Sequence, residues 1–138
     1  MQKTKKQSCI FCRIIQKQLP SYTIYQDSLV QAFLDINPST PGHTLIIPKK
    51  HFANLYTIPA KFLKQIILIS KKLAKKHKKI LKAHGINLLQ SNEQIAGQVV
   101  PHFHLHLIPR YKNDGLKIGL HKKDNQKNDL EQIFNLLK

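Results

Sequence analysis

The sequence predicts an α+β domain: an antiparallel sheet of about five strands, one long helix, and short helices near both ends. Three observations support this. Short β-rich segments stand before and after a single long helical segment, instead of alternating with several helices. The chain has 138 residues, the size of one compact domain. Its hydrophobic content of 41% can form a core and argues against disorder.

The predicted strands are short apolar runs bounded by turn residues. They cover residues 22–25, 29–34, 43–47, 86–90 and 103–108. Only three polar residues separate the first two runs, so we expect these to form a hairpin. Two prolines and a glycine make residues 37–42 a loop, and Pro48 and Pro109 close the strands that precede them. A polar, glycine-containing loop is expected over residues 91–100.

Three helices are predicted from the spacing of apolar residues. The long helix runs from Ala60 to about His84, because its apolar residues recur at three- and four-residue steps, and Gly85 is its stop signal. A short amphipathic helix over residues 9–16 ends before Pro20. Apolar residues at 130, 133, 134, 136 and 137 predict a terminal helix.

The chain is expected to be organised as one domain behind a short tail. Residues 1–8 form a basic tail that we expect to be flexible, and residues 9–138 form the domain, whose C-terminal extension is 111–138. No apolar run approaches the roughly 18 residues of a membrane-spanning helix, and no signal-like apolar segment follows the tail. We therefore expect a cytoplasmic protein without a membrane partner.

The charge balance is strongly basic. Lys plus Arg number 23 and Asp plus Glu 7, which gives a net charge of +16 and suggests an anionic partner such as nucleic acid or a membrane surface. However, the lysines gather at residues 71–79 of the predicted long helix without interleaved aromatics. Only Arg13 and Arg110 supply arginine, the residue suited to bidentate recognition of phosphates and bases. A solvated helix face is therefore the favoured interpretation, and nucleic acid an unlikely partner.

Three histidines alternate with apolar residues over residues 102–106. Because successive strand side chains face opposite sides, His102, His104 and His106 share one face of the predicted strand. Burying a row of imidazoles without partners would be costly, so an active-site surface is the simpler account. The alternatives are a chance run of satisfied histidines and a His-x-His metal pair. Imidazole is also suited to nucleophilic catalysis, and the segment contains no Ser or Thr that could act instead.

Cys9 and Cys12 form a Cys-x-x-Cys pair. Two cysteines cannot build a disulfide framework, and this spacing in a chain without a signal segment indicates metal or redox chemistry. A redox role is the weaker interpretation, because a thioredoxin-like pair is expected after a strand in a βαβ unit. Two ordinary small buried residues are the other alternative.

The segment His102-Phe103-His104-Leu105-His106-Leu107-Ile108 resembles the signature of the histidine-triad (HIT) family, in which three histidines alternate with apolar residues. The similarity extends to the N-terminal segment, to the second and third strands and to the loop before the triad. These are residues 9–15, 32–38, 42–51 and 92–98. The chain is most similar to the Hint-like branch of the family, and the resemblance implies a HIT-like fold.

The resemblance implies a nucleotidyl hydrolase or transferase. Such enzymes cleave nucleoside 5′-phosphoramidates or dinucleoside polyphosphates at the α-phosphorus. By analogy, His104 attacks the phosphorus and forms a nucleotidyl-histidine that water resolves, and covalent catalysis splits one hard displacement into two easier ones. His106 would help to bind the phosphate, and His43 and His102 would complete the catalytic set.

The resemblance also implies a purine-nucleotide site. Asp35 would accept the ribose hydroxyls, or it could instead cap the turn that follows it. Asn92 and Gln98 would position phosphate oxygens or the leaving group. Val99 stands where several Hint-like proteins carry Ser or Thr, so one phosphate contact is missing or is made by a backbone N–H. The apolar walls of the base pocket, which could equally be ordinary core, are Phe11, Leu19, Phe33 and Ile36.

A zinc ion and a homodimer are further implications of the resemblance. Cys9, Cys12, His51 and His102 match a zinc site of the family, and a closed Cys2His2 set leaves no open position, so the zinc would be structural. The dimer would pair the long helix and a central strand across a two-fold axis. Two other function classes remain open: a nucleotide-binding regulatory module with little turnover, and a basic nucleic-acid binder.

Overall fold

The computed structural model describes residues 8–119 and 130–138. Except for Ser8, the expected flexible tail lies outside the described residues, as does part of the C-terminal extension. Five strands form one sheet in the order β1-β2-β3-β5-β4, with every neighbouring pair antiparallel. The predicted α+β class and five-stranded antiparallel sheet are confirmed. The strands are β1 (Thr23–Gln26), β2 (Val30–Leu34), β3 (Thr44–Pro48), β4 (Gly85–Leu89) and β5 (Leu105–Arg110).

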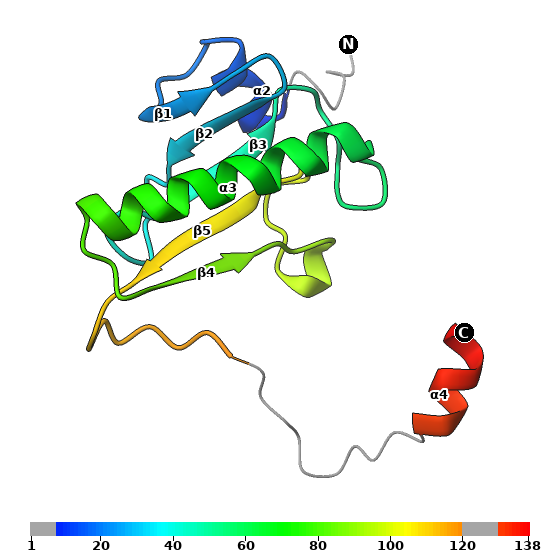
Figure 1. The fold of residues 1–138 in the computed structure, drawn as a ribbon. Coiled ribbons are helices and arrows are strands. Elements are labelled where there is room, and N and C mark those ends of the chain that lie inside the picture. The colour runs from blue at the N-terminus through cyan, green and yellow to red at the C-terminus, as the bar shows by residue number, and fades with distance from the viewer. Residues whose placement is uncertain (1–7, 120–129) are drawn as a thin grey trace.

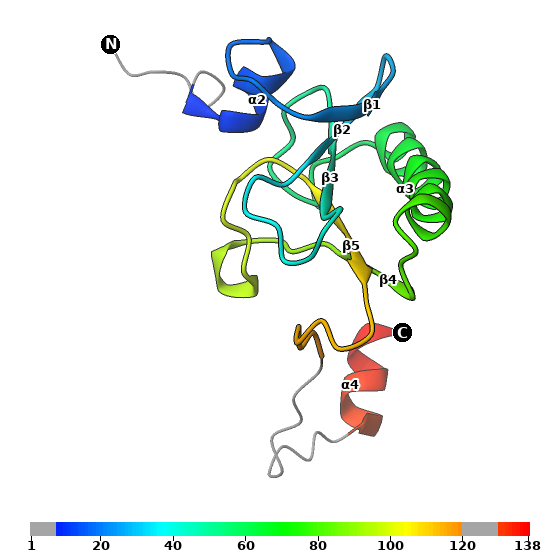
Figure 2. The ribbon, with the colours of Figure 1, turned by 90° about the vertical axis from the view of Figure 1, so that its left-hand side faces the viewer.

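The long helix covers one face of the sheet, and the short helix α2 lies near the β1–β2 end (Figures 1 and 2). The helices are α2 (Ile10–Ile15), α3 (Ala60–Ile80), the 3-10 turn η1 (Gln94–Ala96) and α4 (Leu130–Leu137). The predicted terminal helix is confirmed as α4, and all its residues are exposed. Within the described residues, no helix combines the length and the apolar character needed to cross a bilayer.

The core lies between α3 and the sheet. From α3, the buried side chains of Phe62, Ile66, Ile69 and Leu73 meet those of β2, β3 and β5. The residue that follows His102, Phe103, also lies in this cluster, and its backbone N–H donates to the Phe52 carbonyl at 2.7 Å. The core therefore holds the segment before β5 from its apolar side.

The long helix ends earlier than predicted. Its last residue is Ile80, and Leu81 caps it by donating its N–H to the carbonyl of His77 at 2.9 Å. Lys82 then adopts a left-handed conformation with φ 57°, which turns the chain back toward the sheet. Gly85, predicted as the stop signal, instead begins β4. The stop is thus a left-handed lysine, which the usual glycine signal does not reveal.

β5 lies two residues further along the chain than predicted, and it includes Pro109 instead of ending before it. β3 likewise includes Pro48. Both prolines are tolerated because each lies beyond the stretch over which β3 and β5 pair with one another. At these positions each strand pairs with one neighbour only, β3 with β2 and β5 with β4. The missing N–H of each proline therefore costs no hydrogen bond between strands. As a consequence, His102 lies in a bend and His104 directly precedes β5, and only His106 belongs to the strand.

Candidate active site and metal centre

The three triad histidines lie on one side of the chain although only one of them is in a strand. Phe103 and Leu105 point into the core, and the rings of His104 and His106 lie together on the opposite side with centroids 4.9 Å apart. The rings of His102 and His104 both meet Phe11, and His102 directs its Nδ1 at Cys9 and Cys12. The alternation expected from the sequence therefore holds, and His102 differs from the other two by its contacts with the cysteines.

His104 is held in one tautomer. Its Nδ1 lies 2.7 Å from the carbonyl oxygen of His102, and a carbonyl can only accept, so Nδ1 carries the proton and Nε2 keeps its lone pair. The ring is buried and meets Phe11 edge-on at 5.2 Å between centroids. Burial lowers the pKa of His104, against the opposing effects of the His102 carbonyl and the charge of Asp35. A neutral imidazole with a free Nε2 can act as a nucleophile.

His43 and His106 form a second oriented pair. The backbone N–H of Ser39 donates to His43 Nδ1 at 3.0 Å, so the proton of a neutral His43 sits on Nε2. That Nε2–H donates to His106 Nδ1 at 2.9 Å. The proton of a neutral His106 is therefore on its own Nε2. A neutral His106 thus presents an N–H at Nε2, whereas His104 presents a lone pair at Nε2.

Both rings of this pair are neutral near pH 7. Burial is the largest effect on each: it lowers the pKa of His43, and together with the nearby charges of His104 and His43 it lowers the pKa of His106 to about 4. Asp35 opposes both shifts, and its Oδ2 lies 3.7 Å from His43 Nε2. Because His43 is uncharged, this contact is between a charge and an N–H dipole, not an ion pair.

Asp35 serves the loop and faces the histidines with the same carboxylate. Its Oδ1 accepts the backbone N–H of Asn37 at 2.9 Å, as the turn-capping alternative expected, and its Oδ2 lies near His43. Ligand atoms of Asp35, His43 and His106 lie within 4.8 Å of one another, a spacing that a metal ion could bridge. However, the Ser39 N–H keeps the proton of His43 on Nε2, the atom that would have to bind the metal. This trio is therefore suited to hydrogen bonding.

The amide side chains expected at the phosphate are bonded within the protein. Asn92 Oδ1 accepts the Leu55 N–H at 2.7 Å. Gln98 Oε1 accepts the Glu93 N–H at 2.8 Å, and Gln98 Nε2 donates to the Ala53 carbonyl at 2.6 Å. Both side chains therefore fasten the loop that precedes the triad. Val99, the departure from the family pattern, is 88% exposed in that loop.

The four apolar residues expected around a base are placed differently from one another. Phe11 and Phe33 are buried and meet edge-on at 5.7 Å between ring centroids, and Phe11 also contacts His104. Leu19 is half-buried. Ile36 is 76% exposed. The two phenylalanines are thus core residues that also border the site, while Ile36 is available to a ligand.

Two cysteines and two histidines converge on the far side of His102. His102 Nδ1 lies 3.4 Å from Cys9 Sγ and 3.6 Å from Cys12 Sγ. His51 Nδ1 lies 3.4 Å from Cys12 Sγ and 3.2 Å from His102 Nδ1. A tetrahedral zinc with ordinary bond lengths separates its sulfur and nitrogen ligands by about 3.6 Å and two nitrogens by about 3.3 Å. The four predicted ligands therefore fit a zinc ion.

The orientation of His102 supports the same assignment. Its Nε2 lies 3.0 Å from the carbonyl oxygen of Pro48, so Nε2 carries the proton and Nδ1 presents its lone pair to the cysteines. Burial is the main cause that lowers the pKa of His102 to about 4. The hydrogen bond to the Pro48 carbonyl opposes this shift, and the nearby charges of His51 and His104 add to it. A neutral, oriented imidazole is the form that binds a metal.

Two contributors were missed by the sequence analysis. The Ser39 amide, which sets the tautomer of His43, is a backbone group without a side-chain signal, although its proline-bounded loop was recognised. His77 of α3 is buried, with its Nε2 3.0 Å from both the Gly42 carbonyl and Thr44 Oγ1. It ties α3 to the two residues that flank His43. A polar residue in the apolar stripe of the long helix is the signal that could have found it.

Comparison with known proteins identifies the family of the chain. The HIT domain pattern matches residues 16–113, and the chain therefore belongs to the HIT family. It is 46% identical over 113 residues to the adenosine 5′-monophosphoramidase HNT1 of Saccharomyces cerevisiae, covering 81% of this chain and 69% of that protein.

Two solved structures are also similar to the chain. A HIT family protein from Bacillus anthracis has a TM-score of 0.85 and 39% identity, covering 94% of this chain and 92% of that chain. A zinc-bound histidine triad protein from Mycobacterium smegmatis has a TM-score of 0.78 and 34% identity, covering 88% of this chain and 86% of that chain.

Proposed function

We propose that the protein is a nucleotidyl hydrolase or transferase that cleaves nucleoside 5′-phosphoramidates or dinucleoside polyphosphates at the α-phosphorus. The observation that carries the proposal is the bond of His104 Nδ1 to the His102 carbonyl at 2.7 Å, since it leaves Nε2 as a neutral nucleophile. The similarity to a yeast adenosine 5′-monophosphoramidase supports the same reaction class.

The reaction would proceed in two displacements. His104 Nε2 attacks the α-phosphorus while the bond to the leaving group breaks, which forms a nucleotidyl-histidine; a leaving amine takes up a proton from water as it departs. Water then attacks the same phosphorus and gives up a proton to solvent, and the nucleoside monophosphate leaves as the bond to His104 breaks. His106 donates from Nε2 to the phosphate, because its Nδ1 is occupied by His43. The loss of one oriented hydrogen-bond donor of this kind lowers a rate by roughly 10²- to 10³-fold.

The nucleotide would lie along the α2 and β2 side of the histidines. Asp35 would accept the ribose hydroxyls on the carboxylate oxygen that faces His43. Ile36 would cover the purine, and Phe11, Phe33 and Leu19 would form the wall behind it. Asn92 and Gln98 would act on the phosphate by holding their loop in shape, so that backbone N–H groups near Val99 can supply the contact that valine lacks.

A structural zinc would be held by Cys9, Cys12, His51 and His102, whose ligand atoms have the separations of a tetrahedral site. When bound, the ion would supply a fixed link between α2 and the segment before β5. His102 connects the zinc site to the proposed nucleophile, because its ring lies among the zinc ligands and its backbone carbonyl orients His104. The zinc would therefore support the geometry of the nucleophile without touching the substrate.

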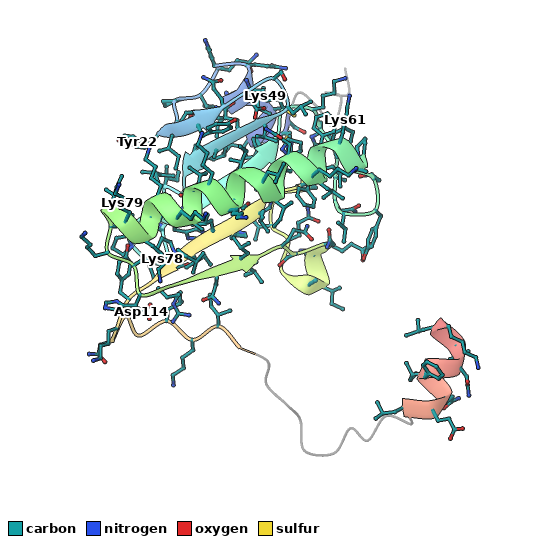
Figure 3. All side chains as sticks on the ribbon, viewed as in Figure 1. Tyr22, Lys49, Lys61, Lys78, Lys79 and Asp114 are labelled. Carbon is teal, nitrogen blue, oxygen red and sulfur yellow. The ribbon has the colours of Figure 1, made fainter. Side chains whose placement is uncertain are left out.

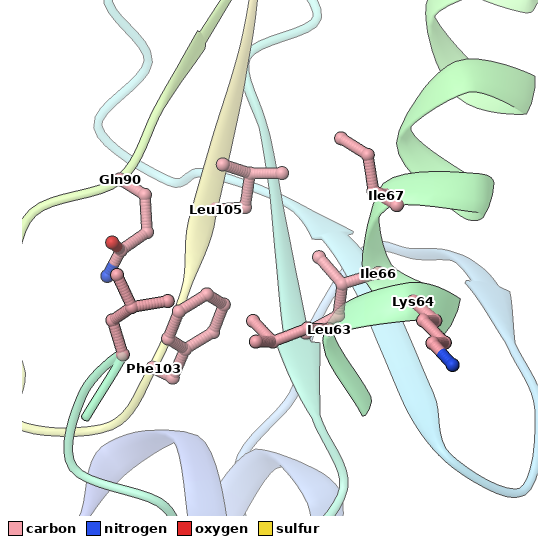
Figure 4. Close-up of a pocket in the computed structure, with 8 residues that line it drawn as sticks. Leu63, Lys64, Ile66, Ile67, Gln90, Phe103 and Leu105 are labelled. Atoms are coloured by element: carbon pink, nitrogen blue, oxygen red, sulfur yellow. The ribbon is translucent and has the colours of Figure 1, made fainter. Parts of the chain in front are cut away.

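The protein would act as a homodimer through the free edge of the sheet. β4 is an edge strand, and an open apolar cavity of about 370 Å³ lies between α3 and β5 beside it. Figure 4 shows Leu63 and Ile67 of α3 facing Phe103 and Leu105 across this cavity. Ile67 is 53% exposed and Leu88 of β4 is 45% exposed. Pairing of two β4 edges would cover these groups and satisfy the unpaired backbone of both strands.

Turnover of adenosine 5′-phosphoramidate tests the proposed reaction. His104→Ala is expected to lower kcat by at least about 10³-fold while adenosine monophosphate still binds, because only the nucleophile is lost. Denaturing mass spectrometry of a rapidly quenched wild-type reaction should find a nucleotidyl adduct on His104. Unchanged turnover in the variant would remove His104 from the chemistry. Binding of nucleotide without turnover by the wild type would favour the regulatory module.

A further inference from the structure

The outer surface of the long helix carries lysine and no acid. We call the six lysines in the C-terminal half of α3 the lysine face. They are Lys71, Lys72, Lys75, Lys76, Lys78 and Lys79, and all are exposed. The helix contains neither aspartate nor glutamate from Ala60 to Ile80. Figure 3 labels Lys78 and Lys79 near the C-terminal end of α3.

The charge of the lysine face is not neutralised by the rest of the described chain. Within the part of the chain that the structure describes, no lysine of the face is ion-paired with a carboxylate. Lys78 Nζ donates to the His84 carbonyl at 3.2 Å, which leaves its charge in place. Asp27 reaches the middle of α3 through Gln65 Nε2 at 2.6 Å, not through a lysine. Six positive charges on about two and a half turns of helix thus create a strong local field.

The six lysines form two rows on the helix. An α-helix turns about 100° per residue, so Lys71, Lys75 and Lys78 line up in one row and Lys72, Lys76 and Lys79 in a second, about 100° further around the axis. The first row lies opposite the buried side of the helix, and the second row lies beside that buried side. A groove that receives the helix can meet both rows.

We propose that the lysine face of α3 binds double-stranded DNA by placing one row against each phosphate strand that borders a major groove. The major groove of B-form DNA is about 12 Å wide and admits an α-helix, whereas the A-form groove of RNA is too narrow. An anionic membrane is less suited, because most of the apolar side of α3 is buried in the core. The exposed apolar residues Ile67, Leu68 and Ile80 do not lie on one side of the helix, so they form no continuous apolar stripe that could insert. The two-row arrangement without acids is what favours this partner over the solvated helix face preferred from the sequence.

The binding is independent of base sequence. Lysine contacts phosphate as a point charge, while arginine is the side chain that reads guanine bidentately. Of the two arginines, Arg110 is fastened to Asp114 at 2.8 Å and to Asn87 at 2.9 Å, and Arg13 lies on α2. The surface therefore has positively charged groups for the backbone and no arginine for the bases. This interaction does not depend on the proposed nucleotide chemistry.

Fluorescence anisotropy of a short labelled duplex of mixed sequence tests the proposal. Three triple variants are compared with the wild type. One removes the first row (Lys71→Gln, Lys75→Gln, Lys78→Gln) and one removes the second (Lys72→Gln, Lys76→Gln, Lys79→Gln). The matched control removes the same charge away from α3 (Lys49→Gln, Lys112→Gln, Lys117→Gln), where all three side chains are in the described part of the chain. Thermal unfolding and turnover are measured on each, and neither is expected to change.

Each row variant is expected to weaken duplex binding at least tenfold at low salt, and the control less than about threefold. The slope of log K against log salt should lose about 2 to 3 in either row variant, since roughly 0.9 is lost per phosphate contact. If the control weakened duplex binding as much as the row variants, net charge alone would explain the effect, and the proposal would be overturned. So would an effect of one row only, equal affinity for duplex RNA, or row-dependent binding to phosphatidylserine vesicles in place of DNA.

Discussion

The Nε2–H of His43 donates to Nδ1 of His106 at 2.9 Å, and the Ser39 amide that bonds the other side of the His43 ring makes this direction of donation obligatory for a neutral ring. Ser39 and His43, four residues apart, thus determine where the proton of His106 sits, 63 residues further along the chain. The same carboxylate that caps the Asp35 turn lies 3.7 Å from the donor. The loop before β3 is therefore part of the site through its backbone as well as its side chains.

Removing the donor should release the tautomer of His106. We expect His43→Ala to lower kcat for adenosine 5′-phosphoramidate by roughly 10- to 100-fold with a smaller change in KM, because the substrate contacts remain. His43→Asn, whose amide N–H can replace the donor, should recover part of the loss. Nitrogen NMR of labelled histidine should show the His106 proton on Nε2 in the wild type and on both nitrogens in exchange in His43→Ala. A wild-type spectrum with the His106 proton on Nδ1 would contradict donation from His43 to His106.

Acid should destabilise the fold through His106. Its pKa is 6.5 for the free side chain and about 4 in the folded protein, so the unfolded state binds more protons between these values. This contribution to the free energy of unfolding is fully present above pH 6.5 and is lost as the pH falls toward 4. In His106→Asn, the pH dependence of urea midpoints over this range should be shallower than in the wild type. Identical slopes for the two proteins would show that His106 titrates normally.

Zinc should be present and should stabilise the fold. Protein purified without added metal is expected to contain one zinc per chain by elemental analysis, and Cys12→Ser much less. At free zinc about 1,000 times Kd, a bound ion stabilises the folded state by about 4 kcal/mol, so the variant should melt several degrees lower. His84→Ala, a histidine outside the cluster, is the control and should keep its zinc. Wild-type protein without zinc would refute the site.

The β4 edge should form the dimer interface. Ile67→Glu places a charge at the apolar cavity beside the edge strand and is expected to give a monomer mass by light scattering at micromolar concentration. Leu68→Glu is the matched control: the neighbouring residue is 60% exposed and does not line the cavity. It should leave the dimer intact. A wild-type monomer, or equal disruption by both variants, would exclude this interface.

Most of the site is predictable from residue types and spacing. The alternation of His102, His104 and His106 predicts that the three rings share one side, and the Cys-x-x-Cys spacing indicates metal or redox chemistry. The alternation holds even though His102 and His104 lie before β5. The core buries Phe103 and Leu105, and this leaves the histidines between and beside them on the other side of the chain.

The boundaries are less predictable. Pro48 and Pro109 predict strand ends, but each lies within a strand. This is possible because β3 and β5 no longer pair with one another at these two positions. Gly85 predicts the end of α3, but a left-handed Lys82 makes the turn. Both errors have one cause: local signals describe a residue's preferences, whereas the neighbouring strands decide which backbone groups need partners.

Apolar periodicity and side-chain chemistry are sufficient to specify the fold class, the shared side of the triad and the ligand types of the metal centre. The proton that each imidazole carries depends instead on the folded chain. The His102 carbonyl, the Pro48 carbonyl and the Ser39 amide orient His104, His102 and His43 in turn. Backbone groups are the same in every residue, so their role at the site depends on where folding places them.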